Sequence, residues 1–295
     1  MNFTKIHLGT KTLLTALAFL AFQCCSPLTV KPLAPALDEE SVASLVSDFK
    51  AQEEKAKTLF FSGALTLKDQ DAENSVQILM IADATPRAGS KSRVGTQASP
   101  YRQVRADTQV CPYGRMKIEI THPWGKPLVH ILIEGQRLDI LDFNEKRFYR
   151  GSLKSKRLSE RIPIPLNHCL LWSLARAFPA LLKHQEAASF AGNQITLLDS
   201  EGEKVQIFEL YSSEPLPSKV FFCKENAVMV FSDFEDEYGI LYARKVDFHS
   251  LDHKIGLAIE IDQMRFNAPL PEAVFRMEVP RDFKTVHLKD DDSEH

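Results

Sequence analysis

Side chains that could hold a metal ion gather in two places in the sequence. The acidic stretch 233–237 lacks the spacing of a calcium-binding loop and runs into Tyr238-Gly239, which is typical of a solvent-exposed hairpin tip. His249 and His253 are four residues apart, but they lie between predicted strands, where no helix aligns them on one face. We therefore expect neither a metal site nor a cofactor.

Motifs for covalent or nucleotide chemistry are missing from the sequence. There is no G-x-S-x-G turn, H-E-x-x-H pair, P-loop or glycine-rich dinucleotide fingerprint, and no nucleophile can be matched with a base. We therefore predict no catalytic residue and a protein that is not an enzyme. The 295 residues carry 36 Lys and Arg against 39 Asp and Glu, so no clustered positive charge favours a nucleic-acid partner.

The N-terminus resembles an export signal. Lys5 and Lys11 precede an apolar run over residues 13–22, which is about half of the ~20 residues that a membrane-spanning helix needs. We interpret residues 1–23 as a signal peptide that is removed. The remaining chain has 34 basic and 39 acidic residues, a net charge of −5.

A cysteine pair follows this segment. A cysteine at this position is typical of bacterial lipoproteins, whose new N-terminal cysteine carries acyl chains, and Ala21 favours Cys24 over Cys25 as the acylated residue. Ordinary signal-peptide cleavage is the alternative. Residues 24–37 include three prolines and almost no charge, so we interpret them as a lipid-anchored tether.

Three more cysteines occur in the body of the chain. Cys111, Cys169 and Cys223 show no C-x-x-C spacing and no paired histidine, which argues against zinc. One pair could form a disulfide in an exported chain, although buried free thiols are the simpler interpretation.

Hydrophobic periodicity predicts a mainly β protein of the α+β class. A helix is expected over residues 38–58, where acidic residues come first and apolar residues recur at helical spacing. Beyond it, apolar and polar residues alternate in about a dozen segments separated by Gly, Asn and Asp, which predicts one strongly curved antiparallel sheet. The expected strands lie near residues 65–68, 75–82, 116–121, 127–133, 137–143, 146–150, 195–199, 204–211, 218–224, 227–234, 241–248 and 257–262.

One apolar helix interrupts the strands. Prolines fix the segment 162–166, Asn167 is a good N-cap, and apolar residues then recur every four positions from Leu170 to Leu182. Pro179 should kink or split this helix. A helix this apolar is expected to be buried against the open face of the sheet. Residues 83–112 are predicted to be a long polar connection, and residues 289–295 a disordered acidic tail.

Two motifs resemble a known family. The segment Pro163-Ile164-Pro165-Leu166-Asn167 with Trp172, and residues 115–126 ending in Pro123-Trp124-Gly125-Lys126, are similar in order and spacing to the LolA/LolB lipoprotein-localisation superfamily. The resemblance covers most of residues 40–283 and is closest to LolB, the outer-membrane lipoprotein receptor. The C-terminal part, residues 267–280, is more similar to the wider superfamily.

This resemblance implies an incomplete β-barrel with a helical lid over residues 38–288, enclosing an apolar cavity for lipoprotein acyl chains. It also implies that Pro123, Trp124 and Gly125 form an exposed loop that contacts the membrane. The residues expected to line the cavity and lid are Leu65, Leu67, Met116, Ile118, Ile120, Leu166, Leu170, Leu171, Trp172, Leu174, Phe178, Leu257, Ile259 and Ile261.

The implied function is that of a monomeric lipoprotein, anchored in the outer membrane and facing the periplasm. It would receive lipoproteins from a periplasmic carrier and insert them into the membrane. Two alternatives keep the same fold: a general carrier of lipid or glycolipid, and a structural envelope lipoprotein whose sheet is filled by its own side chains.

Overall fold

The computed structural model describes residues 35–69, 72–85, 114–153, 155, 167–252 and 256–288. The predicted signal peptide, Cys24 and most of its tether, Leu166, most of the 83–112 connection and the acidic tail lie outside these residues. Predictions about those segments stay predictions.

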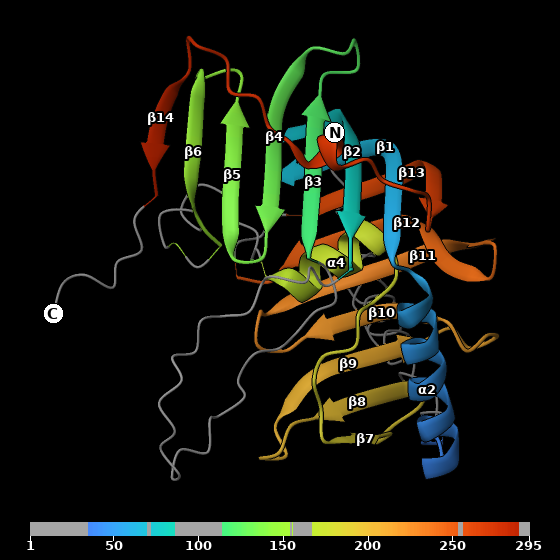
Figure 1. Ribbon diagram of the computed structural model, residues 1–295. Coiled ribbons are helices and arrows are strands. Elements are labelled where there is room, and N and C mark those ends of the chain that lie inside the picture. The colour runs from blue at the N-terminus through green and yellow to red at the C-terminus, as the bar shows by residue number, and fades with distance from the viewer. Residues whose placement is uncertain are drawn as a thin grey trace, which may run out of the picture. The chain divides into compact units, whose positions relative to one another are not determined.

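The described strands form one large open sheet (Figure 1). Its 14 strands follow the order β14-β6-β5-β4-β3-β2-β1-β13-β12-β11-β10-β9-β8-β7, and the two end strands do not pair with each other. Neighbouring strands are antiparallel except β14, which is parallel to β6. The predicted curved, non-closed sheet is confirmed. The strands are β1 (Thr58–Asp69), β2 (Ala72–Asp83), β3 (Arg115–Thr121), β4 (Pro127–Glu134), β5 (Arg137–Asp142), β6 (Arg147–Ser152), β7 (Glu186–Ala188), β8 (Gln194–Leu198), β9 (Lys204–Leu210), β10 (Pro217–Phe222), β11 (Ala227–Glu237), β12 (Ile240–Ser250), β13 (Gly256–Phe266) and β14 (Lys284–His287).

The sheet folds over on itself at its centre. In Figure 1, strands β3 to β6 of the first half run in a different direction from strands β8 to β10 of the second half, and the long, paired strands β1 and β13 join the two halves. The pairing of β1 with β13 shifts register between Ser62 and Gly63, which marks a bulge, and bulges bend strands. A Cβ atom at Gly63 would lie 2.1 Å from the Glu260 carbonyl oxygen, so only glycine permits this close approach.

Helix α2 (Glu39–Lys55) packs beside the second half of the sheet. Its N-cap is Asp38, whose Oδ1 accepts the Ser41 N–H at 2.7 Å. Phe49 is buried, with its ring centroid 5.8 Å from that of Phe178 and 5.5 Å from that of Phe208. The predicted N-terminal helix is confirmed, and it ends slightly earlier than expected.

Helix α4 (His168–Arg176) is shorter than the pattern predicted. Asn167 caps it as expected, because its Oδ1 accepts the Leu170 N–H at 2.7 Å. The helix ends at Ala177, which has a left-handed φ of 52°. The predicted break at Pro179 is confirmed, since the residue before a proline is disfavoured in the α region and the chain leaves the helix ahead of Pro179. The helix does not resume afterwards, so the expected helical spacing as far as Leu182 is wrong beyond Arg176.

The C-terminal segment covers the outer face of the first half of the sheet. A short 3-10 helix, η1 (Glu272–Phe275), places Phe275 against Ile81 and Leu132 in a small separate apolar cluster. Beyond η1, β14 adds to the edge of the sheet at β6. Residues such as Leu132 thus face this outer cluster, while their neighbours, such as Ile133, face the main core.

Candidate functional site

The interior of the folded sheet holds nearly all of the residues predicted to line a cavity. Eleven of the fourteen are less than 9% exposed and belong to a single apolar cluster, and Ile120 is half-buried and packs against it. Leu166 lies outside the described residues. The eleven are Leu65, Met116, Ile118, Leu170, Leu171, Trp172, Leu174, Phe178, Leu257, Ile259 and Ile261.

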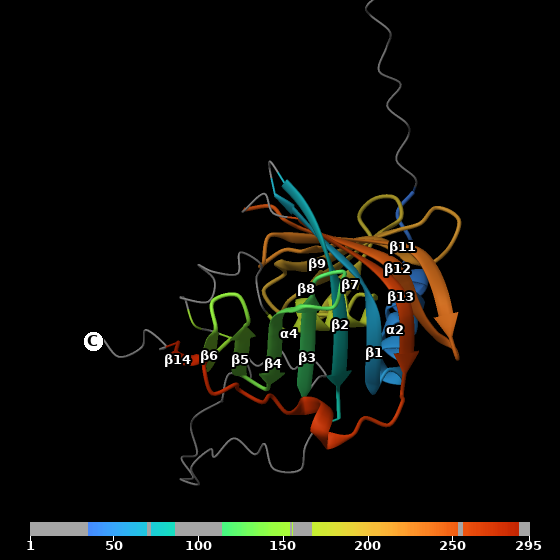
Figure 2. The same cartoon turned by 90° about the horizontal axis from the view of Figure 1, so that it is seen from above.

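Leu67 is the exception. It lies near the end of β1 and is 41% exposed, although Leu65, two residues earlier, is buried. The far ends of β1 and β2 project beyond α4 (Figure 2), and neither of the two described α-helices lies over them. That Leu67 lines the cavity stays a prediction. Its exposure could not be read from the sequence, because alternation shows which face a side chain takes and not whether anything covers that face.

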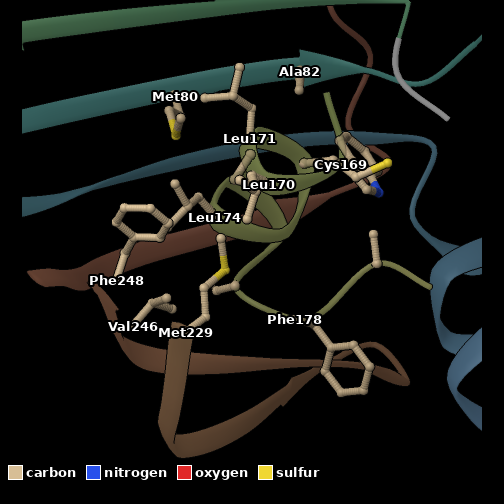
Figure 3. Close-up of a cluster of buried hydrophobic side chains, with 14 of the residues drawn as sticks. Met80, Ala82, Cys169, Leu170, Leu171, Leu174, Phe178, Met229, Val246 and Phe248 are labelled. Atoms are coloured by element: carbon tan, nitrogen blue, oxygen red, sulfur yellow. The ribbon is translucent and has the colours of Figure 1, made fainter. Parts of the chain in front are cut away.

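Helix α4 occupies the interior between the two halves of the sheet. Figure 3 shows Leu171 directed toward Met80 and Ala82 of β2, while Leu174 points toward Phe248. Met229 and Val246 close the opposite side. Every residue from Cys169 to Arg176 is buried. The predicted lid helix therefore fills the interior with its own side chains.

Several residues of the wall around α4 were not predicted from the sequence. Met80, Met229, Val246 and Phe248 are buried on the inner face, on strands that were expected but whose inward positions were not assigned. The sequence signal that could have identified them is the alternation of apolar and polar residues along β2, β11 and β12. The pairing of these strands with β1 and β13 then decides which alternate set faces α4.

Polar links hold the chain at the C-terminal end of α4. The Ala243 N–H donates to the Ala177 carbonyl at 2.8 Å, and Ser173 Oγ accepts the Ala180 N–H at 2.9 Å. Gln206 spans the next residues, accepting the Leu182 N–H and donating to the Ala180 carbonyl. The segment after the helix is thus fixed to β9 and β12 by directional bonds, while the helix surface itself packs through apolar contacts.

One charged side chain lies inside this apolar site. Arg176 is fully buried, and its Nη2 donates to the Gln52 carbonyl of α2. Its guanidinium lies over the Phe178 ring, 4.7 Å from the centroid. Burial lowers the pKa of Arg176 to about 10, and the Glu53 carboxylate partly opposes that shift. Burial likewise raises the pKa of Glu53, whose Oε2 accepts the Leu181 N–H at 3.3 Å.

The β3–β4 loop presents Trp124 to solvent. The His122 N–H donates to the Lys126 carbonyl, and the Gly125 N–H donates to the His122 carbonyl, each at 2.8 Å, which closes a tight turn. Gly125 has a φ of 83°, a conformation that glycine adopts without strain. Trp124 is 76% exposed and stacks on the His122 ring, with centroids 4.6 Å apart. The predicted exposure is confirmed, and membrane contact stays a prediction.

The cysteines differ from the simpler expectation. Cys169, at the start of α4, is disulfide-bonded, whereas Cys223 is free and exposed. Since Cys223 is free, the partner of Cys169 lies outside the described residues. The interpretation of Cys169 as a buried free thiol is wrong, because spacing along the chain does not show which cysteines the fold brings together.

Polar clusters elsewhere give no second site. Within the described residues, no group of three or more His, Cys, Asp or Glu side chains is placed to hold a metal ion. The acidic stretch 233–237 lies in the β11–β12 hairpin as expected, where Asp233 pairs with Lys245. A pocket of about 490 Å³ between residues 182–185, 199–201 and 224–225 has a mostly polar lining, half of whose residues are charged, and this does not suit acyl chains. No helix in the described part of the chain is long and apolar enough to cross a membrane.

Comparisons with known proteins are distant. No family model and no curated protein matches the chain. A DUF1329 family protein from Desulfovibrio piger is 12% identical over 80% of this chain and 96% of its own, with a TM-score of 0.47. A LolA superfamily protein from Nitrosomonas europaea is 13% identical over 80% and 97%, with a TM-score of 0.43. The Mycobacterium tuberculosis lipoprotein LppX is 10% identical over 79% and 99%, with a TM-score of 0.29. All three TM-scores are below 0.5, so these likenesses carry no argument about function.

Proposed function

We propose that this protein binds acyl chains inside its folded sheet, in the place that α4 occupies in this structure. The observation that carries the proposal is that a single short helix fills the interior between the two halves of an open sheet. No covalent step is required. An acyl chain competes with the helix for the same apolar walls, and direction comes from a difference in affinity between states.

Burying the apolar side chains of α4 and Phe178 and burying an acyl chain contribute similar free energies. Leu170, Leu171, Trp172, Leu174 and Phe178 are all less than 5% exposed. Burying a large apolar side chain contributes about 1.5–3 kcal/mol, so the five together contribute roughly 10 kcal/mol. An acyl chain gains ~0.8 kcal/mol per CH₂, which is also on the order of ten kcal/mol for a typical chain. Exchanging one occupant for the other is therefore close to balanced.

The setting we propose is the periplasmic face of the outer membrane. The disulfide at Cys169 suits an exported protein, since such bonds persist in oxidising compartments. Acylation of Cys24 would anchor the chain, and a periplasmic carrier would deliver lipoproteins to it. The intact mass of the mature protein, extracted from membranes, tests cleavage and acylation together and reveals any retained ligand.

Helix displacement can be tested by thiol labelling. Leu171→Cys places a thiol on α4 where the native side chain is 4% exposed, and Cys223→Ser removes the free native thiol of the described residues. We expect palmitate to accelerate maleimide labelling at position 171. Val246→Cys, at a fully buried position on β12, is the matched control and should stay protected. Equal protection of both thiols at saturating palmitate would exclude displacement of α4.

The filled interior also favours a second candidate function, a structural envelope lipoprotein. In that case a neutral fluorescent probe for apolar cavities finds no saturable site in the wild-type protein. A general lipid carrier is distinguished in another way: mass spectrometry of the ligand retained on purification identifies free lipid or glycolipid rather than acylated protein.

A further inference from the structure

Two arginines are buried in the part of the chain that the structure describes, and one of them is paired with carboxylates. Arg115, on β3, is 6% exposed. Its Nε and Nη2 donate to Asp83 at 3.2 and 3.0 Å, and its Nη1 and Nη2 donate to Glu272 at 2.7 and 2.9 Å. Its guanidinium also lies 3.9 Å from the centroid of the Phe275 ring. This side chain ties the C-terminal segment to the sheet, and it is satisfied within the protein.

Arg176 is also buried and also lies over an aromatic ring, that of Phe178, but its hydrogen bonding differs. It has 0% exposure, and among the described residues Nη2 has a single carbonyl acceptor while Nε and Nη1 have no hydrogen-bond partner. Glu53 is the carboxylate that acts on it, but the two side chains share no hydrogen bond, and Glu53 is engaged by the Leu181 N–H. A buried charge with unmatched donors is strongly unfavourable unless something compensates it.

The position of Arg176 relates it to the proposed acyl site. It follows Trp172 by four residues, so the two side chains lie on the same face of α4. It also lies in the last turn of the helix, just after the apolar side chains from Leu170 to Leu174. A ligand that replaces those side chains along the helix would bring its polar end to one end of that stretch.

We propose that Arg176 binds the anionic headgroup, a carboxylate or a phosphate, of the amphiphile whose acyl chain enters the sheet. This rests on the proposed function and narrows its ligand class to acidic lipids. Guanidinium donors match the oxygen geometry of carboxylates and phosphates, and hydrogen bonds between charged groups are about twice as strong as neutral ones. A neutral headgroup leaves the charge of Arg176 unpaired.

The test compares ligands that differ only in headgroup charge. Displacement of a neutral fluorescent probe from the full-length protein gives the affinities of palmitate and 1-hexadecanol, and of dipalmitoyl phosphatidic acid and dipalmitoylglycerol. We expect each acid to bind about 10- to 100-fold more tightly than its neutral partner, as one or two charge-assisted hydrogen bonds would give. A preference in the first pair only assigns a carboxylate, and one in the second pair only assigns a phosphate.

Variants assign the preference to this side chain. Arg176→Met and Arg176→Gln should bind acids and neutral lipids equally, while Arg176→Lys should keep part of the preference. Arg115→Lys, at the paired buried arginine, is the matched control and should keep all of it. Circular dichroism confirms that each variant is folded before its titration. The comparison of acids with neutral lipids on the wild-type protein tests the proposal even if a variant does not fold.

The outcomes separate this inference from the proposed function. If no lipid, charged or neutral, displaces the probe from the wild-type protein, acyl-chain binding itself fails. If acids and neutral lipids displace it equally well, acyl-chain binding stands and the role of Arg176 is refuted. A folded Arg176→Met protein that still prefers the acids would refute that role as well.

Discussion

Replacing Trp124 by glutamate should impair delivery to membranes while leaving acyl-chain binding unchanged. Trp124 lies on the β3–β4 loop with 76% of its surface exposed, and it takes no part in the apolar cluster around α4. Tryptophan favours the membrane interface because its ring is apolar while its N–H stays hydrated. Trp124→Glu removes that preference and adds a charge that resists leaving water.

The expected size of the effect follows from the exposed area. A tryptophan side chain buries about 150–250 Å² when fully enclosed, which at about 25 cal/mol per Å² contributes roughly 4–6 kcal/mol. His122 already covers one ring face by stacking at an interplanar angle of 5°, and an interfacial site encloses only part of the remainder. About 2 kcal/mol is left for membrane contact. Its loss weakens vesicle association about 30-fold.

Vesicle flotation measures the contribution of Trp124 to membrane association directly. Protein with Cys24→Ala and Cys25→Ala has no site for an anchor, so its association with vesicles reports on the loop alone. Tyr238→Glu is the matched control: Tyr238 is 93% exposed, but it lies at the turn between β11 and β12. The register of β3, β2, β1, β13 and β12 places that turn at the opposite ends of the strands from Trp124.

Two results would refute this reasoning. Wild-type rates of lipoprotein transfer to vesicles by Trp124→Glu would show that the loop does not take part in delivery. An equal loss of vesicle association in Trp124→Glu and Tyr238→Glu would show that added negative charge, rather than the loss of an interfacial tryptophan, explains the effect.

Three further predictions concern stability. Burial alone would raise the pKa of Asp83, but hydrogen bonds from Thr85 and Arg115 outweigh it and lower the pKa below its usual value; the stability this adds is therefore present above about pH 4 and lost as pH falls further, and urea unfolding against pH should show a shallower acid loss in Asp83→Asn. Gly63→Ala forces a Cβ to within 2.1 Å of a backbone oxygen, so we expect a lower thermal midpoint and a loss of several kcal/mol; a loss below about 1 kcal/mol would contradict the close approach. Cys169→Ser should cost about 2–5 kcal/mol in urea unfolding by removing a disulfide, whereas Cys223→Ser should be neutral, and equal effects of the two would contradict the assignment.

Alternation of apolar residues was enough to predict most of the sheet. Met116, Ile118 and Ile120 alternate with polar residues on β3, and such runs predicted about a dozen strands in one strongly curved sheet, where the structure has 14. Two strands escaped this logic. β7 has only three residues, and β14 is mostly exposed and parallel to β6, a partner more than 130 residues earlier in the chain. Neither strand contains enough alternating apolar and polar residues to be predicted from the sequence.

The sequence predicted which apolar residues would be buried at the candidate site, but not how the chain is arranged around them. Apolar spacing showed that α4 would be buried, but the end of the helix depended on the left-handed Ala177 ahead of Pro179. Arg176 stands in the sequence as an ordinary basic residue near a helix C-terminus, where a solvated side chain is the usual outcome. Only the packing of α2 against the same end of the interior shows that this charge is enclosed.

If the protein binds acyl chains as proposed, the near balance between α4 and an acyl chain would give the loop that carries Trp124 a role. If α4 or the ligand bound the walls far more tightly, the protein would be permanently closed or permanently loaded, and a contact contributing about 2 kcal/mol would change little. With both occupants contributing on the order of ten kcal/mol, a bias of that size shifts the ratio of loaded to unloaded protein about 30-fold. Contact of Trp124 with a membrane can supply such a bias only if that contact is stronger in the unloaded protein, with α4 in the interior, than in the loaded protein. That condition requires Trp124→Glu to slow release more than uptake.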